Sequence, residues 1–71
     1  MQSEIRTYRD NLAYLIGLGR DALRLGDDAA SRGDVDLAAI CENDLRLYTR
    51  VVVAMGFDPA EYFAQVQEGP R

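Results

Sequence analysis

The sequence predicts an all-α protein, a long antiparallel helical hairpin with a short C-terminal third helix. Apolar residues recur at helical spacing over the first thirty residues and again through the middle of the chain. Two short junctions, Gly33-Asp34 and Gly56-Phe57-Asp58-Pro59, each join a glycine that ends one helix to an aspartate that caps the next. We expect one helical domain over residues 1–71, with helices over about 3–32, 35–55 and 59–67 and a frayed tail over 68–71.

The first helix is expected to begin after an N-cap at Ser3, with Glu4 in its first turn, where negative charge is favoured. Gly26 is a possible end for it. Because Ala29 and Ala30 continue the helical spacing beyond that glycine, we expect the helix to run on to Ser31 or Arg32. Gly17 and Gly19 lie inside it, where each costs about 1 kcal/mol relative to alanine, so they mark a bend or a close backbone approach.

The apolar arc of this first helix is unusually wide. Its two stripes together cover about 200°, whereas a surface helix normally buries a stripe somewhat over 100° wide. We expect the first stripe to pack on the other two helices and the second to lack a partner within the chain. The first stripe is Ile5, Tyr8, Leu12, Leu15, Ile16, Leu23 and Ala30; the second is Tyr14, Leu18, Ala22, Leu25 and Ala29.

The second helix is expected to begin after an N-cap at Asp34, with Glu42 and Arg46 as an outward ion pair. A link this short makes the first two helices antiparallel neighbours. The predicted core face of the second helix is Leu37, Ile40, Cys41, Tyr48, Val51, Val52 and Met55.

The third helix is signalled by Asp58 as N-cap, Pro59 at the first helical position and Glu61 in a pattern like a capping box. Phe57 is expected to pack back on the chain. The apolar face is Tyr62, Phe63 and Val66. From the helix lengths we expect this helix to cover the N-terminal end of the first one, near Ile5, Tyr8 and Leu12.

Composition limits both stability and function. A chain of 71 residues with a single cysteine and no histidine has neither an internal disulfide nor a zinc site to support a small core, which leaves oligomerisation. The net charge of −4 argues against direct nucleic acid binding. The longest strongly apolar stretch, 51–57, is too short to cross a membrane, and the N-terminus does not resemble a secretory signal. We therefore expect a cytoplasmic protein that binds no membrane.

The residue inventory does not favour catalysis. The sequence has no histidine and no lysine, and it has no glycine-rich phosphate loop. We expect no catalytic, cofactor or metal site. Cys41 has apolar neighbours and is expected to be a buried structural thiol. Arg20, Arg24, Arg46 and Arg50 are expected to pair with neighbouring acids rather than to bind phosphate.

Asp44 is the most unusual polar residue, because it falls within the apolar arc of the second helix. In one interpretation it makes a specificity contact to an arginine of a partner chain or to a tyrosine hydroxyl. In the other, Leu45 takes the core position and Asp44 lies at the edge, in water. The predicted partner-binding residues are Tyr14, Leu18, Ala22, Leu25, Ala29 and Asp44.

We therefore expect a small non-enzymatic protein–protein interaction module, a regulator or adaptor. Two copies are expected to associate into a four-helix-bundle-like core as a homodimer, and the second stripe serves self-association, a target, or both. Two alternatives stay open. One is an acidic inhibitor that occupies the nucleic-acid-binding surface of another protein, and the other is an accessory subunit of an enzyme.

Overall fold

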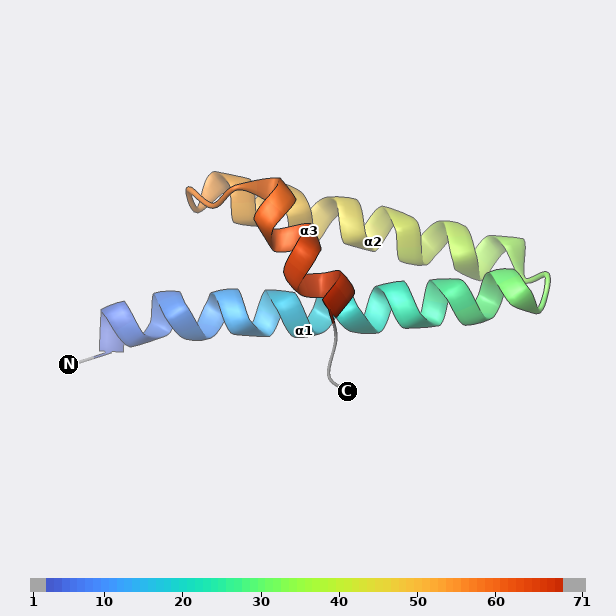
Figure 1. The fold of residues 1–71 in the computed structure, drawn as a ribbon, viewed down its shortest axis with the longest axis horizontal. Coiled ribbons are helices and arrows are strands. Elements are labelled where there is room, and N and C mark those ends of the chain that lie inside the picture. Colours follow the sequence, from blue (N-terminus) through green and yellow to red (C-terminus); the bar gives the residue numbers. More distant parts are fainter. Residues whose placement is uncertain (1–2, 69–71) are drawn as a thin grey trace.

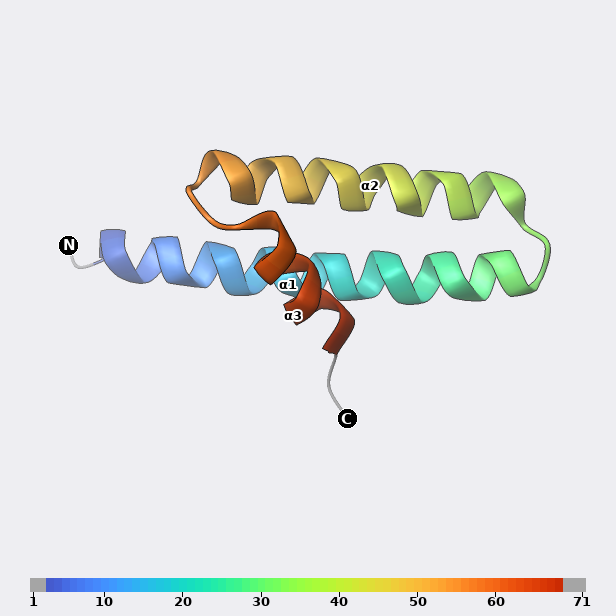
Figure 2. The same ribbon diagram turned by 45° about the horizontal axis from the view of Figure 1, so that its top comes forward.

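The protein is all-helical over the described part of the chain. A computed structural model describes residues 3–68, with side chains from residue 10 onward. It contains α1 (Ser3–Ser31), α2 (Val35–Ala54) and α3 (Pro59–Glu68), and no strand within the described residues. Helix α2 returns alongside α1 in the opposite direction, and α3 crosses the pair (Figures 1 and 2). The predicted ranges differ from these by one residue at the C-terminal end of each helix, and residues 69–71 of the predicted tail lie outside the described part.

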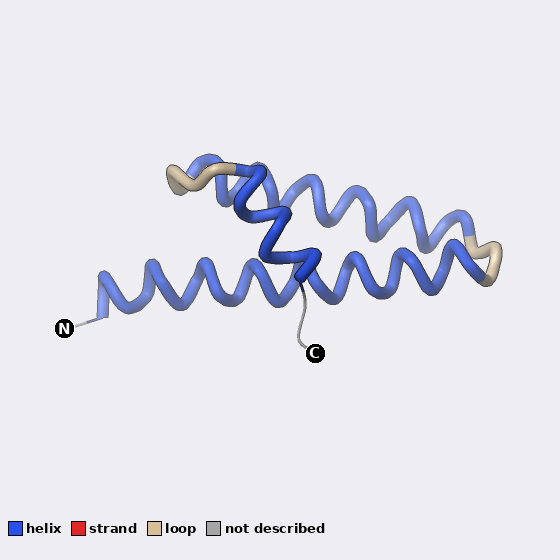
Figure 3. The backbone as a smooth tube through the Cα atoms, in the orientation of Figure 1, coloured by secondary structure: helices blue, strands red, loops and turns tan. Residues whose placement is uncertain are grey.

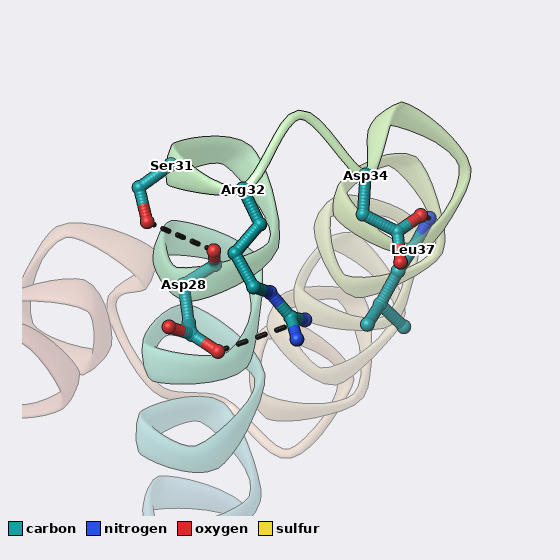
Figure 4. A network of polar contacts seen from close by, with 5 residues as sticks. All are labelled: Asp28, Ser31, Arg32, Asp34 and Leu37. Atoms are coloured by element: carbon teal, nitrogen blue, oxygen red, sulfur yellow. Dashed lines mark hydrogen bonds and ion pairs between the residues drawn. The ribbon is translucent and has the colours of Figure 1, made fainter.

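The turn between α1 and α2 has the local chemistry that the sequence predicts. Gly33 has a positive φ of 79°. The Asp34 N–H donates to the Ala29 carbonyl at 2.8 Å, which satisfies one of the carbonyls left free at the helix end. The Asp34 side chain then accepts the Leu37 N–H at 3.2 Å, so Asp34 is the N-cap of α2. Around the same turn Ser31 donates to the Asp28 carbonyl, and Arg32 pairs with the Asp28 carboxylate (Figure 4).

The second connection repeats this pattern and adds an apolar contact. Gly56 has a φ of 96°, and the Phe57 N–H donates to the Val52 carbonyl at 3.0 Å. The Phe57 side chain packs against the core cluster that contains Val52, as predicted. Asp58 accepts the Ala60 N–H at 3.1 Å and caps α3. Two short loops therefore suffice to join the three helices (Figure 3).

Helix α1 continues through Gly26, as expected, and this glycine has a packing role. A Cβ atom at Gly26 would lie 3.2 Å from the Cys41 Cβ. Ala22 and Ala29, one turn to either side, are buried, with 6% and 0% of their surface exposed. Small residues on α1 thus let the α2 backbone approach closely, and Cys41 is the buried thiol that the sequence predicts.

The core is small and lies where all three helices meet. Val52, Tyr62 and Val66 form its buried centre. Around them pack half-buried side chains from both long helices and from the second connection: Leu12, Leu15, Ile16, Leu23, Leu45, Tyr48 and Phe57.

Helix α3 crosses α1 near the middle of its length (Figure 1). The expected contact with Leu12 is confirmed, because Leu12 packs against the core cluster that contains Tyr62 and Val66 and lines a groove with Tyr62. The side chains of Ile5 and Tyr8, like the predicted cap Ser3, lie outside the described ones. The crossing point is Gly19, where an added Cβ would lie 2.7 Å from both the Tyr62 hydroxyl and Val66. The prediction from helix lengths took α3 to continue in line with α2, whereas α3 turns across the pair, so its contact with α1 extends from Leu12 to Gly19 and beyond (Figure 1).

Candidate interaction surface

One side of the α1–α2 pair is covered by α3; we call it the covered side. The Tyr62 hydroxyl donates to the Leu15 carbonyl at 2.7 Å, and Arg20 donates twice to the Gln65 carbonyl, at 3.2 and 3.0 Å. These bonds join α3 to the backbone and to a side chain of α1. The arginine also brings positive charge to the carbonyls at the end of α3, where it is favoured.

The opposite side of α1 carries apolar side chains without a covering helix. Ile16 lines a groove together with Tyr62 and therefore faces α3. At about 100° per residue, Tyr14, Leu18 and Leu25 lie roughly 160–200° around the helix from Ile16. Tyr14 is 67% exposed and Leu25 49%, while Leu18 is half-buried.

Helix α2 presents a similar row on the same side. A second groove runs between α1 and α2 and is lined by Leu23 and Asp27 of α1 and by Ala38 and Glu42 of α2. Because Leu23 also packs against the core with α3, Glu42 lies on the edge of α2 that is nearest the covered side. Three apolar residues lie roughly 140–180° around α2 from Glu42. They are Ile40, Leu47 and Val51, which are 56%, 48% and 45% exposed.

The two rows adjoin because their helices lie side by side, and together they form what we call the bare face. Half-buried Leu37 completes the α2 row, since it lies one turn before Ile40. The alternating steps of three and four residues along this row are those of a coiled-coil seam. The bare face comprises Tyr14, Leu18 and Leu25 of α1 and Leu37, Ile40, Asp44, Leu47 and Val51 of α2.

Asp44 is the single charged residue within this α2 row. Leu45 packs against the core, so the interpretation that Leu45 takes the core position is confirmed. Asp44 itself is half-buried rather than fully solvated, and no ion pair within the described residues involves it. Along the row it lies between two exposed apolar residues, Ile40 and Leu47.

The residues of the predicted partner-binding stripe of α1 fall into two groups, one on the bare face and one buried against α2. Tyr14 and Leu25 are exposed, Leu18 is half-buried, and all three belong to the bare face. Ala22 and Ala29 are buried at the contact with α2, so the expectation that the whole stripe lacks a partner within the chain is wrong for these two. Their small side chains are what allow that close contact.

The placement of Ile40 and Val51 in the core is also wrong, because both are exposed. The predicted apolar arc of α2 is wider than the contact that α2 makes, and of its members Cys41 and Val52 are the buried ones. The row that includes Leu47 was missed. Its signal was present in the sequence as the regular series Leu37, Ile40, Asp44, Leu47, Val51.

The described arginines mostly neutralise neighbouring groups. Arg24 pairs with Asp21 at 2.9 Å, Arg46 with Glu42 at 3.1 Å and Arg32 with Asp28 at 3.6 Å. The pairing of Arg46 with Glu42 was predicted, and Arg24 pairs with a neighbouring acid as expected. The expectation is wrong for Arg20, which binds the Gln65 carbonyl, and for Arg50, which has no ion pair within the described residues. The carboxylates of α1 that take part are therefore locally compensated.

Tyr62 is the described side chain whose ionisation the fold clearly changes. Burial raises the pKa of Tyr62 to about 12 from an ordinary value of 10.0, with a further contribution from neighbouring Tyr48. Its protonated hydroxyl serves as the donor to the Leu15 carbonyl. Tyr62 thus holds α3 on α1.

Two other kinds of site, metal centres and membrane spans, were also sought among the described residues. No three His, Cys, Asp or Glu side chains gather there in an arrangement that would hold a metal ion. None of the described helices carries a stretch long and apolar enough to span a bilayer. Comparison with known proteins adds no further lead: no family model, no curated protein and no solved structure matches this chain.

Proposed function

We propose that this protein is a small non-enzymatic interaction module, a regulator or adaptor, and that its bare face mediates protein–protein contact by self-association into a homodimer. The observation that carries the proposal is the exposure of two adjacent apolar rows on the side away from α3. Scattered apolar residues are ordinary on a protein surface, whereas a contiguous apolar patch is typical of an interaction site. Ile40, Leu47 and Val51, each 45–56% exposed, form the centre of this patch.

The size of the exposed surface supports the same proposal. A compact monomer of 7.9 kDa is expected to expose about 4,400 Å², whereas this chain exposes 5223 Å². The excess, about 800 Å², is what one partner contributes to an interface of standard size. The chain is also elongated, with a radius of gyration of 13.4 Å against about 11 Å for a compact domain of this length.

The limited core gives a physical reason for association. Only Val52 and Val66 are large side chains that are fully buried in the described part of the chain. Small domains commonly supplement such a core by oligomerisation. Two copies packed by their bare faces would enclose α1 and α2 of each chain in a four-helix core, with the α3 helices outside.

The alternatives gain less support. An acidic inhibitor of nucleic acid binding needs an uncompensated row of carboxylates, but Asp21 and Asp28 on α1 are each paired with an arginine. No described feature points to the active site of a larger enzyme.

Two valines on α2 provide a matched test. Val51, on the bare face, and Val53, outside it, are 45% and 48% exposed. We expect the wild-type chain to be dimeric at micromolar concentration, Val51→Asp to be monomeric and Val53→Asp to remain dimeric, as measured by light scattering and sedimentation. Helical circular dichroism would show that both variants fold. Equal behaviour of the two variants, or a monomeric wild type, would count against the proposal.

A further inference from the structure

Asp44 and Arg50 are opposite charges on α2 that the fold leaves uncompensated. Asp44 is half-buried in the bare face, and Arg50 is exposed at its edge. Neither forms an ion pair or side-chain hydrogen bond within the described part of the chain. The other arginines with described side chains all have partners: Arg20, Arg24, Arg32 and Arg46.

These two charges are placed symmetrically about Leu47. Each lies three residues from Leu47, about 4.5 Å away along the helix axis. Asp44 and Arg50 lie about 60° around the helix from Leu47, on opposite sides of it. In a heptad repeat, Asp44 and Leu47 occupy successive core positions of the α2 row. Arg50 occupies the flanking position that directly precedes the next core residue, Val51. Coiled coils use one polar core residue and such flanking charges to specify register and orientation.

A second α2 helix with the same sequence fits this arrangement if it runs antiparallel. A two-fold axis through Leu47 brings Asp44 of each chain level with Arg50 of the other, since both are equally far from the axis. A parallel pair would instead place the two Asp44 carboxylates side by side, which is unfavourable between apolar side chains. The charges of α2 are therefore complementary to a reversed copy of α2.

We propose that the bare face binds a second copy of this chain with α2 antiparallel to α2, Leu47 at the two-fold axis and two symmetric ion pairs between Asp44 and Arg50. The inference rests on the proposed function and specifies its occupant and register. An isologous contact uses this one face on both copies and leaves α3 exposed on the outside.

Charge exchange tests the register directly. In the Asp44→Arg homodimer, both residues of each proposed pair, 44 of one chain and 50 of the other, are positively charged. In the Arg50→Asp homodimer, both residues of each pair are negatively charged. Each single variant alone should lose dimer affinity by at least about 30-fold, because breaking a buried charge pair costs about 2 kcal/mol or more. An equimolar mixture of the two variants should form a heterodimer with affinity close to that of the wild type, since both ion pairs are restored.

The double variant Asp44→Arg with Arg50→Asp should dimerise with itself for the same reason. Sedimentation of each sample, with native mass spectrometry of the mixture, would measure the species, and circular dichroism would show that each variant is helical. If Val51→Asp breaks the dimer but the mixture stays monomeric, the register is wrong and the proposed interaction face stands. If the wild type is monomeric, both proposals fail.

Discussion

The covered side and the bare face of the α1–α2 pair are built from similar residues and differ in what completes them. On the covered side, α3 buries Val52, Tyr62 and Val66 and its polar groups bond to α1. On the bare face, Ile40, Leu47 and Val51 have the spacing of a packed seam but no helix from the described chain covers them. The difference suggests that the covered side stabilises the single chain, whereas the bare face is available for a partner.

The largest effect is expected on the covered side, at Tyr62, which is 2% exposed. Tyr62→Ala removes a buried ring and should lower the free energy of unfolding by about 3–5 kcal/mol. Phe63→Ala, the neighbouring aromatic at 37% exposure, should cost about 1 kcal/mol or less. Urea denaturation followed by circular dichroism measures both. Similar losses for the two variants would contradict the assignment of Tyr62 as the main contact of α3.

Alkaline pH should weaken the covered side through the same residue. The Tyr62 pKa is about 12 in the folded chain and about 10 in the unfolded one, so the folded state holds its proton more tightly. The stabilisation is complete below pH 10 and is lost as pH rises toward 12, at about 1 kcal/mol per pH unit. Denaturation at stepped pH values would show this slope, and Tyr62→Phe should reduce it. An unchanged slope in that variant would assign the effect to another group.

Alanine substitutions at two glycines of α1 distinguish the effect of steric crowding on stability from that of helix propensity. Gly19→Ala puts a Cβ within 2.7 Å of Tyr62 and Val66, so it should destabilise the chain by about 1–3 kcal/mol as α3 shifts. Gly17 has no such neighbour within 4 Å, so Gly17→Ala should stabilise by up to about 1 kcal/mol. Thermal unfolding of the two variants would show shifts of opposite sign. Stabilisation by both would mean that α3 does not pack at Gly19.

The smallest effects on stability are expected for the polar contacts of two arginines, Arg20 and Arg46. Arg20→Gln removes the two bonds to the Gln65 carbonyl and should cost about 1 kcal/mol. Arg46→Gln breaks a single exposed ion pair on the outside of α2 and should cost about 0.5 kcal/mol or less. Urea denaturation at moderate salt distinguishes them. Equal effects would show that Arg20 contributes only as a surface charge.

Local sequence signals predicted the helices and their ends closely. Gly33, Asp34, Gly56 and Asp58 lie where the sequence places them because caps depend on a few neighbouring backbone atoms. The sequence also indicated that apolar surface exceeds what one small chain buries. It located only the α1 part of that surface, at Tyr14, Leu18 and Leu25, because Ile40 and Val51 of α2 were expected in the core.

What the amino-acid sequence by itself determined is therefore the number, limits and capping of the helices and an excess of apolar residues. Tertiary structure decided which residues carry the excess, because the contact between two helices is narrower than the apolar arc of either one. Small residues at Ala22, Gly26 and Ala29 set how closely α2 approaches α1. Gly19 sets where α3 crosses, and the crossing leaves the opposite side bare.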